Sequence, residues 1–433
     1  MSDLTSTLTA LGTDVTPWDA VAPEQKASIQ AALGPQPPPQ ALVCPTTQTQ
    51  LAEVMACAYQ NRWRVLPCGS GSKLDWGGLA EGLDLVVSTR RLNRIIDHAV
   101  GDLTVTAEAG LTLADLQQAL TAANQMLPLD PAYPQQATLG GLIATGDAGS
   151  LRQRYGGIRD MLIGLSLVRY DGQIAKAGGR VVKNVAGYDL MKLMTGSYGT
   201  LGLLSQVTFR TYPLQEASQT VVFSGSATAI GQLSQTLRLS ALTPVALDVL
   251  SPALMAALGQ QAFGLAARFQ SISAGVEEQV QRLLALGQAQ NLSGQVLTGE
   301  ADAQFWQQSG AQVFAQDQSP VVIAKVGILP EAAISLLEQL QNETTGMGRI
   351  HASSGVGQIR LEGAAAGPQQ VLKLRSHCET AAGYLTVLSA PLALKQTVEV
   401  WGYSGNALDL MRRLKQQFDP ERLLSPGRFV GGI

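Results

Sequence analysis

Short apolar runs alternate with amphipathic segments along most of this 433-residue chain, a pattern typical of a protein that mixes strands and helices. Strands are predicted at 41–44, 63–67, 84–88, 103–108 and 162–169, and helices at 17–33, from 47 onward and at 113–123. The dipeptide Asp171-Gly172 separates the last of these strands from another at 173–177, which predicts a β-hairpin. The proline-rich run at 35–39 marks the entry into a main domain.

Beyond Pro213 the pattern changes, because glycine-dense loops become rare and strands alternate with longer helices. Strands are predicted at 220–223 and 321–326, helices at 276–286 and 331–341, and a final helix at 406–418. The sequence therefore predicts an α+β protein in four parts: an N-terminal helical extension at 1–36, a first domain at 37–214, a second α+β domain at 215–395, and a C-terminal segment at 396–433 that returns to the first domain.

Composition narrows the class of protein further. Hydrophobic residues make up 45% of the chain and charged residues 15%, with a net charge of −3. The chain has no excess of basic residues that would predict nucleic acid as a partner. Its low content of charged residues mildly favours a subunit interface. The N-terminus has neither the pattern of a signal peptide nor a long apolar run. We therefore expect a cytoplasmic protein that reaches a membrane only through partner subunits.

The cysteines do not indicate a metal centre. Cys44, Cys57, Cys68 and Cys378 lie far apart and form no CxxC pair. Iron–sulfur and structural zinc sites use closely spaced cysteines. We expect no metal site in this chain and four reduced thiols.

The stretch 178–210 concentrates six glycines around a short amphipathic segment and ends in an alternating strand. Glycine is costly in regular structure, because it loses the most backbone freedom on folding. Its density here indicates either a turn-rich connection or a backbone that passes close to a ligand. The stretch alone favours neither interpretation.

A second glycine-rich loop, Pro67–Lys73, follows a predicted strand. Consecutive glycines and serines allow several backbone N–H groups to turn toward one anion. The loop lacks both the GxxxxGK[ST] spacing of a nucleotide-triphosphatase and the GxGxxG of a Rossmann helix. Phosphate binding and a tight surface turn both remain open for this loop alone.

A third stretch joins Leu127–Pro131 to Ala137–Gly146. Thr138 is placed to cap a helix that starts with two glycines, and such a start can bind an anion. Arg152–Gly157 follows, either as a solvated loop or as part of the same site. Together the three stretches favour a dinucleotide with a diphosphate and a planar ring, and FAD fits best because the Rossmann fingerprint is absent.

The stretch GGRVVKNVAGYDLMKLMTGSYGTLG and the ending FDPERLLSPGRFVGGI carry a resemblance to a known family. The chain resembles the FAD-binding PCMH-type (vanillyl-alcohol oxidase-like) family, and within it the FAD-binding E subunits of glycolate oxidases. The resemblance implies a two-subdomain FAD-binding domain at 37–214, a ferredoxin-like cap domain, and a C-terminal segment that packs on the FAD domain.

The same resemblance implies a set of FAD-binding residues. The backbone amides of one loop would bind the pyrophosphate: Gly69, Ser70, Gly71, Ser72 and Lys73. The diphosphate and ribityl chain would follow Pro128, Thr138, Gly140, Gly141 and Thr145. A family RYG motif matches Arg154, Tyr155 and Gly156. The adenine and the flavin pyrimidine edge would lie by Gly196, Gly199, Thr200, Leu201 and Leu204, with Ser425 at a flavin edge. A further shared motif without assigned roles contains Lys183, Asn184, Tyr188 and Asp189.

Three departures from the family pattern refine the expectation. No histidine lies between residues 1 and 97, so we expect non-covalent FAD. Relatives that oxidise acids carry a pair of histidines in the second domain, whereas here His351 stands without a second, and Gln358 follows. His351 is therefore a weak catalytic candidate, since a lone histidine is more often structural. Ser425 replaces the more usual asparagine and offers fewer hydrogen-bond donors.

The resemblance implies the FAD-binding subunit of a complex that oxidises glycolate to glyoxylate. This chain would relay electrons from a second, catalytic flavin subunit toward an iron–sulfur subunit. Two alternatives remain: a self-sufficient FAD-dependent dehydrogenase for another 2-hydroxy acid such as D-lactate, and a structural subunit whose flavin site has decayed.

Overall fold

The computed structural model describes residues 4–179, 187–315, 320–344 and 346–433, which fold into two units. The first unit contains residues 1–148, 157–214 and 404–433, and the second contains 149–156 and 215–403. The second unit thus ends at 403 rather than 395, and it includes a short segment from the middle of the first domain. Lys183 and Asn184 lie outside the described residues.

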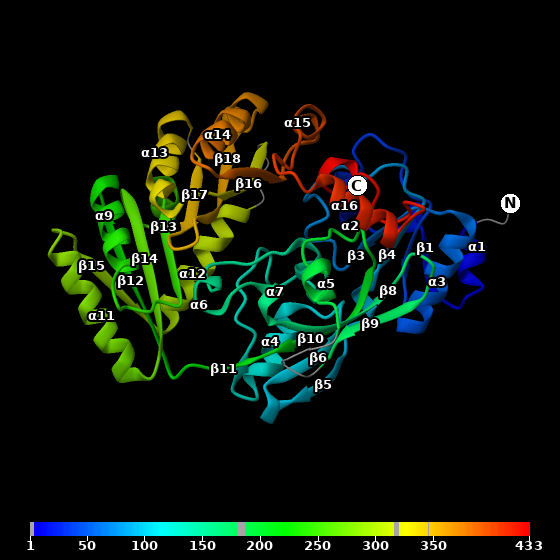
Figure 1. The fold of residues 1–433 in the computed structure, drawn as a ribbon, viewed down its shortest axis with the longest axis horizontal. Helices are drawn as coiled ribbons and strands as arrows, with labels where there is room; N and C mark the ends of the chain where they lie inside the picture. The colour runs from blue at the N-terminus through cyan, green and yellow to red at the C-terminus, as the bar shows by residue number, and fades with distance from the viewer. Residues whose placement is uncertain (1–3, 180–186, 316–319, 345) are drawn as a thin grey trace. The chain divides into compact units, whose positions relative to one another are not determined.

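The first unit is built on two larger sheets, which Figure 1 shows in blue and in cyan to green. The first sheet has the order β1-β2-β4-β3, in which β4 pairs in parallel with β2 and β3 and β1 is antiparallel to β2. Its strands are β1 (Asp14–Pro17), β2 (Ala41–Cys44), β3 (Val65–Cys68) and β4 (Leu85–Ser88). Within the predicted N-terminal helical extension at 1–36, residues 14–17 form β1 of this sheet.

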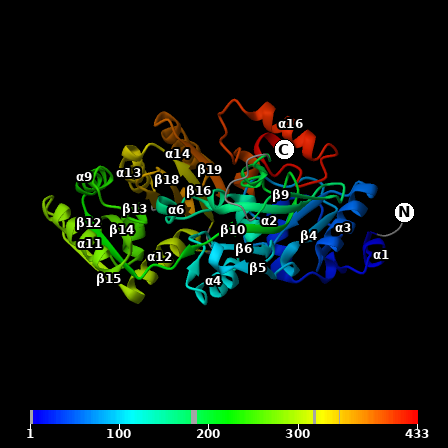
Figure 2. The ribbon, with the colours of Figure 1, turned by 60° about the horizontal axis from the view of Figure 1, so that its bottom comes forward.

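The second sheet of this unit is antiparallel, with the order β5-β6-β10-β8-β9. Figures 1 and 2 both show β5, β6 and β10 side by side. The strands are β5 (Ile95–Ala99), β6 (Thr104–Glu108), β8 (Leu162–Val168), β9 (Ile174–Gly178) and β10 (Leu203–Arg210). A two-stranded pair joins β7 (Gln125–Met126) and β11 (Tyr212–Pro213). The two sheets correspond to the two subdomains that the resemblance implied.

Helices cover these sheets through apolar faces. In α3, Leu51, Val54, Met55 and Ala58 are fully buried at helical spacing, and Thr47 caps the start by accepting the N–H of Gln50 at 3.1 Å. The helices of the unit are α1 (Leu4–Thr9), α2 (Pro23–Leu33), α3 (Gln48–Asn61), α4 (Leu113–Thr121), α5 (Leu139–Thr145), α7 (Ile158–Met161), α8 (Leu190–Met194) and α16 (Leu408–Phe418).

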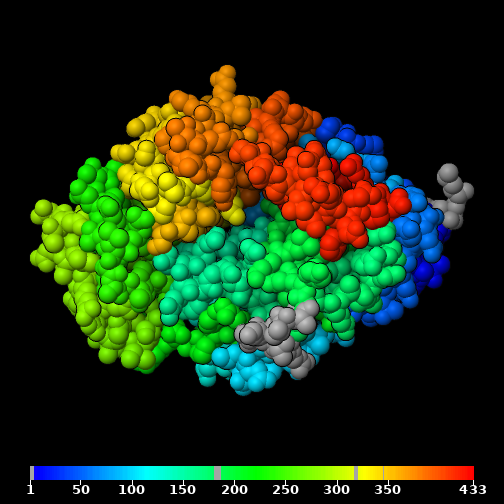
Figure 3. Space-filling view, viewed as in Figure 1, coloured from blue at the N-terminus to red at the C-terminus, as the bar shows by residue number. Residues whose placement is uncertain are grey.

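The C-terminal segment belongs to the first unit, as the sequence predicted. Figure 3 shows it in red at the surface, next to blue atoms from the N-terminal part of the chain. Lys415, at the end of α16, is 4% exposed and donates from Nζ to Asp419 Oδ2 (2.6 Å), the Thr200 carbonyl (2.9 Å) and the Leu424 carbonyl (2.8 Å). Beyond it, Leu424 bridges Val65 at the first sheet.

The second unit contains an eight-stranded antiparallel sheet with the order β15-β12-β14-β13-β17-β18-β16-β19. Its strands are β12 (Ala217–Gly225), β13 (Ala246–Leu250), β14 (Phe263–Ser271), β15 (Gly294–Thr298), β16 (Val321–Gly327), β17 (Met347–His351), β18 (Val356–Glu362) and β19 (Tyr384–Ser389). The helices are α6 (Arg152–Tyr155), α9 (Ala227–Arg238), α10 (Pro252–Ala257), α11 (Ser273–Gln288), α12 (Gly299–Phe314), α13 (Ala333–Glu343), α14 (Pro368–Thr380) and α15 (Leu392–Thr397).

The order of these elements is a βαββαβ motif that occurs twice. Elements β12-α9-β13-β14-α11-β15 form one ferredoxin-like half, and β16-α13-β17-β18-α14-β19 form the other. The halves join where β13 pairs with β17. The expected ferredoxin-like architecture is present as a structural repeat that no repeated sequence motif had indicated.

The two faces of this sheet differ in polarity. One face packs apolar side chains against α9, α11, α13 and α14, as Figure 1 shows in green, yellow and orange. Because side chains alternate along a strand, the opposite face of β17 and β18 carries Arg349, His351, Gln358 and Arg360, all of which are buried. The α+β fold class is therefore confirmed, with one apolar and one polar face in the second unit.

Replacing Lys415 with methionine should lower the free energy of unfolding by about 3–5 kcal/mol, because Asp419 would remain buried without its cation. Urea unfolding of the purified protein measures the loss. Arg412→Met is the control, since it removes an exposed ion pair to Asp409 from the same helix and should cost at most about 1 kcal/mol. Equal effects of both substitutions would contradict the structural role of Lys415.

Candidate functional site

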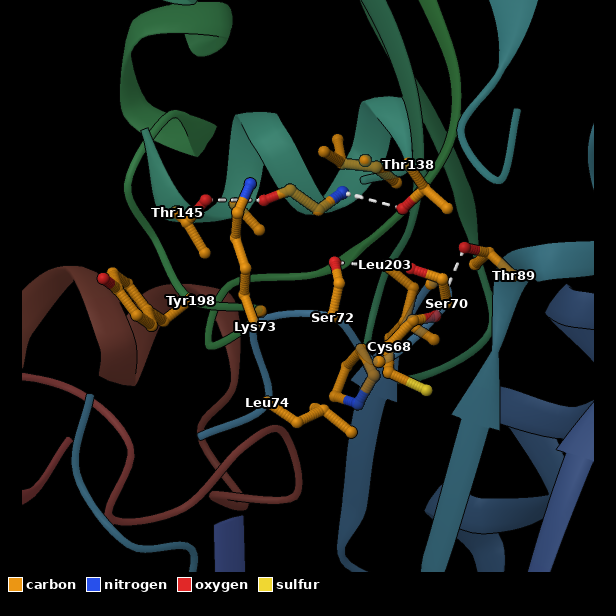
Figure 4. Close-up of a pocket in the computed structure, with 18 of the residues that line it drawn as sticks. Cys68, Ser70, Ser72, Lys73, Leu74, Thr89, Thr138, Thr145, Tyr198 and Leu203 are labelled. Atoms are coloured by element: carbon orange, nitrogen blue, oxygen red, sulfur yellow. Dashed lines mark hydrogen bonds between the residues drawn. The ribbon is translucent and has the colours of Figure 1, made fainter. Parts of the chain in front are cut away.

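One cavity in the first unit collects the glycine-rich loops that the sequence analysis singled out. It encloses about 810 Å³ of space, including the solvent at its open mouth. Figure 4 shows α5 on one side and the loop with Ser70, Ser72 and Lys73 on the other. Its walls are formed by Pro67, Cys68, Gly69, Ser70, Gly71, Ser72, Lys73, Leu74, Thr89, Ala137, Thr138, Gly140, Gly141, Ala144, Thr145, Ser197, Tyr198, Gly199, Gly202, Leu203, Leu204 and Arg428.

The loop after β3 is arranged as an anion cradle. Its carbonyl groups are used within the protein, since Ser88 Oγ donates to the Gly69 carbonyl at 2.7 Å and the Leu74 N–H donates to the Gly71 carbonyl at 3.2 Å. The backbone N–H groups of residues 70–73 donate no hydrogen bond within the part of the chain that the structure describes. Neighbouring free N–H groups at a cavity wall form an anion-binding concavity.

The Lys73 side chain is not a free cation for this cradle. Its Nζ lies 2.8 Å from Asp147 Oδ2, and both side chains are more than nine-tenths buried. Asp147 also accepts the N–H of Ala132 at 2.9 Å. The ion pair neutralises both charges, so the contribution of Lys73 to an anion is confined to its backbone.

The start of α5 does not provide the second anion cradle that the sequence suggested. Its first three N–H groups are all engaged: Leu139 donates to the Leu111 carbonyl, Gly140 to the Ala109 carbonyl, and Gly141 to Thr138 Oγ1. Thr138 is the expected N-cap, but it satisfies the helix itself. Helix α5 therefore offers the cavity a wall without bulky side chains rather than free donors.

Glycines let the loops around the cavity approach one another closely. A Cβ on Gly69 would collide with the Thr138 side chain, and one on Gly199 would lie 3.2 Å from Ser425 Oγ. Gly199 also has a φ of +73°, which favours glycine. These contacts bring the loop after β3, the start of α5 and the C-terminal segment to one place.

The C-terminal segment supplies Arg428 to the cavity wall. Its guanidinium donates to the Trp76 carbonyl at 2.6 Å and the Gly78 carbonyl at 2.7 Å. Burial lowers the pKa of Arg428 to about 10, with the nearby Tyr198 and Asp75 opposing that shift. Ser425 is fully buried behind Gly199, and its Oγ has no hydrogen-bond partner among the described residues.

Two side chains at the cavity could in principle act as nucleophiles. Burial raises the pKa of the Cys68 thiol to about 12, which leaves it protonated at neutral pH. Burial also raises the pKa of the Tyr198 hydroxyl. Both groups are therefore poor nucleophiles at neutral pH.

The cavity brings together many of the expected FAD-binding residues: Gly69, Ser70, Gly71, Ser72, Lys73, Thr138, Gly140, Gly141, Thr145, Gly199 and Leu204. Five others from the first unit do not line it: Pro128, Gly196, Thr200, Leu201 and Ser425. Arg154, Tyr155 and Gly156 belong to the second unit. Their roles, and those of the lining residues, remain predictions.

The sequence analysis assigned no role to several wall residues, among them Thr89, Ser197, Tyr198 and Arg428. Thr89 follows β4, and its Oγ1 donates to the Cys68 carbonyl at 3.3 Å. Tyr198 and Arg428 lie inside the two motifs that carried the family resemblance, which was a usable signal. Thr89 had none, because only the pairing of β3 with β4 brings it there.

His351, the weak catalytic candidate, lies in the second unit in a buried contact with Asp248. Its Nδ1 is 2.7 Å from Asp248 Oδ1, and the two side chains are 1% and 0% exposed. Its Nε2 is buried without a hydrogen-bond partner among the described residues. This geometry is that of a structural histidine, and His351 is not among the residues that line the cavity.

Comparison with known proteins identifies the domain around the cavity. Residues 39–178 match the FAD binding domain family. The chain is 38% identical over 176 residues to the glycolate oxidase subunit GlcE of Escherichia coli, covering 40% of this chain and 49% of that protein. It is 31% identical over 184 residues to the glycolate oxidase subunit GlcD of Bacillus subtilis, covering 42% and 39%. It is 32% identical over 175 residues to a D-lactate dehydrogenase of Anaerostipes hadrus, covering 40% and 37%.

The whole fold also has a solved counterpart. A crystal structure of p-cresol methylhydroxylase superposes with a TM-score of 0.75 at 14% identity, covering 98% of this chain and 96% of that one. The chain spans half or less of the length of the curated relatives named above. Residues 39–178 therefore form an FAD-binding domain, and its cofactor is FAD.

Neither metal-binding groups nor membrane spans stand out. Across the described ranges, no three or more histidine, cysteine or acidic side chains lie close enough together to hold a metal ion. Within the same ranges, no helix has the length and apolarity needed to cross a bilayer.

Asp248→Asn should change how stability depends on pH. Burial raises the pKa of Asp248, but the charge and hydrogen bond of His351, the charge of Arg349 and the hydrogen bond from Ser150 outweigh it and hold the pKa below its usual value. Because the folded pKa is depressed, the stabilisation is complete above the unfolded pKa of about 4 and is lost as the pH falls through the folded value.

Urea unfolding at a series of pH values tests this expectation. Asp248→Asn should cost about 3 kcal/mol near neutral pH, and the difference from wild type should shrink as the pH falls below about 4. A difference that stays constant down to the lowest pH at which both proteins fold would show that the Asp248 carboxylate is not the titrating group.

Proposed function

We propose that this chain is the non-covalent FAD-binding subunit of a dehydrogenase for small 2-hydroxy acids, with glycolate, which yields glyoxylate, as the first candidate substrate. The observation that carries the proposal is the set of N–H groups at residues 70–73, which have no acceptor among the described residues. They border the cavity, and residues 70–73 themselves lie in the segment 39–178 that matches an FAD binding domain.

The chain's own residues suit an FAD diphosphate at the loop after β3. Backbone N–H groups can bind an anion without the help of a cationic side chain. This matters here because the charge of Lys73 is already neutralised by Asp147. The glycines of α5 and Gly199 leave room for a flat group beside them. FAD supplies a ring that accepts a hydride or electrons, and the protein binds, orients and shields it.

Non-covalent attachment is supported by the chemistry of the wall. A covalent flavin link through the protein needs a nucleophilic side chain at the ring. The thiol of Cys68 and the hydroxyl of Tyr198 both have raised pKa values, which disfavours their reactive forms.

The proposed partners are a second flavin subunit and an iron–sulfur subunit. Two relatives are named as glycolate oxidase subunits, GlcE and GlcD, which supports a role within a complex. The second histidine of acid-oxidising relatives is absent from this chain, and Gln358 instead binds Arg349. An electron relay from a catalytic flavin subunit to an iron–sulfur subunit accounts for both observations.

A second candidate is a self-sufficient dehydrogenase for another acid. The similarity to a D-lactate dehydrogenase, at nearly the same identity as to GlcD, favours it. A structural subunit with a decayed flavin site is disfavoured, because such a site would not need to retain free N–H groups at its cradle.

The flavin content and reduction of the purified chain, alone and with its partners, test the proposal. We expect bound FAD that denaturation in acid releases, little reduction by glycolate, D-lactate or D-2-hydroxyglutarate with the chain alone, and reduction by glycolate in the complex. Turnover of glycolate by the isolated chain would overturn the relay, and turnover of D-lactate alone would establish the second candidate. A chain that binds no FAD would overturn the whole proposal.

Gly141→Leu should abolish FAD binding without unfolding the protein. A Cβ at this helical position would meet only Thr138 Oγ1, at 3.2 Å, so the added side chain enters the cavity. Replacing glycine within a helix should leave stability equal or raise it by up to about 1 kcal/mol. We expect FAD affinity to fall at least about a hundredfold, because the leucine occupies ligand space.

Gly101→Leu is the matched control, because Gly101 is exposed, has open space around its Cα and lies outside the cavity. Fluorescence titration of the apoproteins with FAD, together with thermal unfolding, compares the variants. Full FAD affinity in Gly141→Leu would show that FAD does not occupy the cavity beside α5.

A further inference from the structure

The loop that forms the anion cradle makes little use of its own backbone N–H groups. Those of residues 70–73 have no acceptor among the described residues, so they do not help to fix the loop. The start of the loop is attached to the first sheet, because Ser88 Oγ donates to the Gly69 carbonyl at 2.7 Å and Thr89 Oγ1 donates to the Cys68 carbonyl at 3.3 Å. A side chain must supply a polar attachment further along the loop.

The side chain of Lys73 supplies this attachment. Figure 4 shows it running from the loop toward α5. Its Nζ is buried and lies 2.8 Å from Asp147 Oδ2. Lys73 lines the cavity, and its own backbone N–H is one of the cradle donors. The residue that presents a donor to the cavity therefore also ties the loop to another part of the first unit.

Asp147 is itself fixed at the place where Lys73 reaches it. Helix α5 ends at Thr145, and Gly146 follows with a φ of +61°, the left-handed conformation that commonly ends a helix. The Asp147 N–H then donates back to the Leu142 carbonyl at 3.3 Å. Its Oδ2 also accepts the N–H of Ala132, which precedes α5, at 2.9 Å. Asp147 thus joins both flanks of α5 to the cradle loop.

The burial of both charges makes this attachment strong. An ammonium group and a carboxylate lose their hydration on burial, and moving either away from its partner leaves an unpaired buried charge. The loop therefore cannot shift away from α5 without a large cost in free energy. A binding site that is already in place binds its ligand more tightly, because less freedom is lost when the ligand arrives.

We propose that Lys73 and Asp147 are positioning residues, whose ion pair holds the loop after β3 against α5 so that the diphosphate of FAD meets a preformed cradle. The proposal rests on the proposed function, because that function places the diphosphate at residues 70–73. It gives the Lys73 side chain a role through position rather than through its charge.

Asp147→Asn separates position from charge, because the two roles predict opposite changes in FAD affinity. The amide keeps the size of the carboxylate and an oxygen for the Ala132 N–H, but it leaves Lys73 without a counter-ion. If charge decided the outcome, the released cation would attract the diphosphate and strengthen binding. Because the loop loses its attachment, we expect the FAD affinity of the apoprotein, measured by fluorescence titration, to fall at least about tenfold.

Limited digestion of the apoprotein with a protease that cuts after lysine measures the loop without any flavin. Lys73 is 7% exposed, so the protease reaches its peptide bond only when the loop leaves its place. Cleavage after Lys73 should accelerate at least about tenfold in Asp147→Asn, since the buried ion pair is lost. Mass spectrometry of the fragments identifies this cut among those at other lysines.

The double variant Lys73→Met/Asp147→Asn keeps the test meaningful if Asp147→Asn folds poorly. It leaves neither charge buried without its partner, so it should remain folded. Because its side chains no longer attract each other, FAD affinity should still fall at least about fivefold. Wild-type affinity in this variant would overturn the role of the ion pair.

Glu108→Gln is the matched control. Glu108, on β6, is a buried carboxylate of the same unit that accepts the N–H of Arg94 at 2.9 Å and pairs with its guanidinium. It does not line the cavity. We expect FAD affinity and cleavage after Lys73 to stay within about twofold of wild type. Changes equal to those of Asp147→Asn would overturn the proposal, since general loosening would then explain both.

The remaining outcomes separate the two levels of the argument. Unchanged cleavage after Lys73 in Asp147→Asn would overturn the attachment of the loop. Faster cleavage with unchanged or stronger FAD binding would overturn the positioning of the cradle for the diphosphate. If wild-type protein binds no FAD, the proposed function fails, whereas the cleavage comparison uses no FAD and still tests the ion pair.

Discussion

The buried ammonium group of Lys415 is the interaction on which the cofactor cavity most depends. It joins three oxygens from different parts of the first unit: the Asp419 carboxylate and the carbonyls of Thr200 and Leu424. Thr200 follows Gly199 at the cavity wall, and Leu424 precedes Ser425 and bridges the first sheet. A buried cation is tolerable only when such acceptors surround it, so the glycine loop and the C-terminal segment are held together within narrow limits.

The glycines around the cavity serve two physical purposes that a sequence cannot separate. Gly69 and Gly140 are small because the Thr138 side chain and Ala109 approach them closely. The N–H groups of residues 70–73 instead find no acceptor in the part of the chain that the structure describes. Packing explains why the loops meet, and the free donors explain why an anionic cofactor would bind where they meet.

The second unit uses buried charge differently. Its sheet has one face of apolar side chains under four helices and another on which Asp248 contacts His351 and is stabilised by the charge of Arg349. The Asp248–His351 pair spans the joint between two ferredoxin-like halves, and Ser150 ties a segment from the first domain to it.

The sequence by itself determined the α+β class, strands such as 41–44 at their observed bounds, and the helix at 113–123 to within two residues. It also singled out the glycine loop at 69–73, which lines the cavity. These follow from local periodicity, capping and turn chemistry, which act over a few residues. Only the tertiary structure decided that Asp147 neutralises Lys73 and that the N–H groups at the start of α5 are already engaged. It also decided that Thr89 and Arg428 reach the cavity and that residues 149–156 belong to the second unit. Each of these depends on pairing between residues far apart in the chain, and no local pattern specifies which distant group will satisfy a given charge or donor.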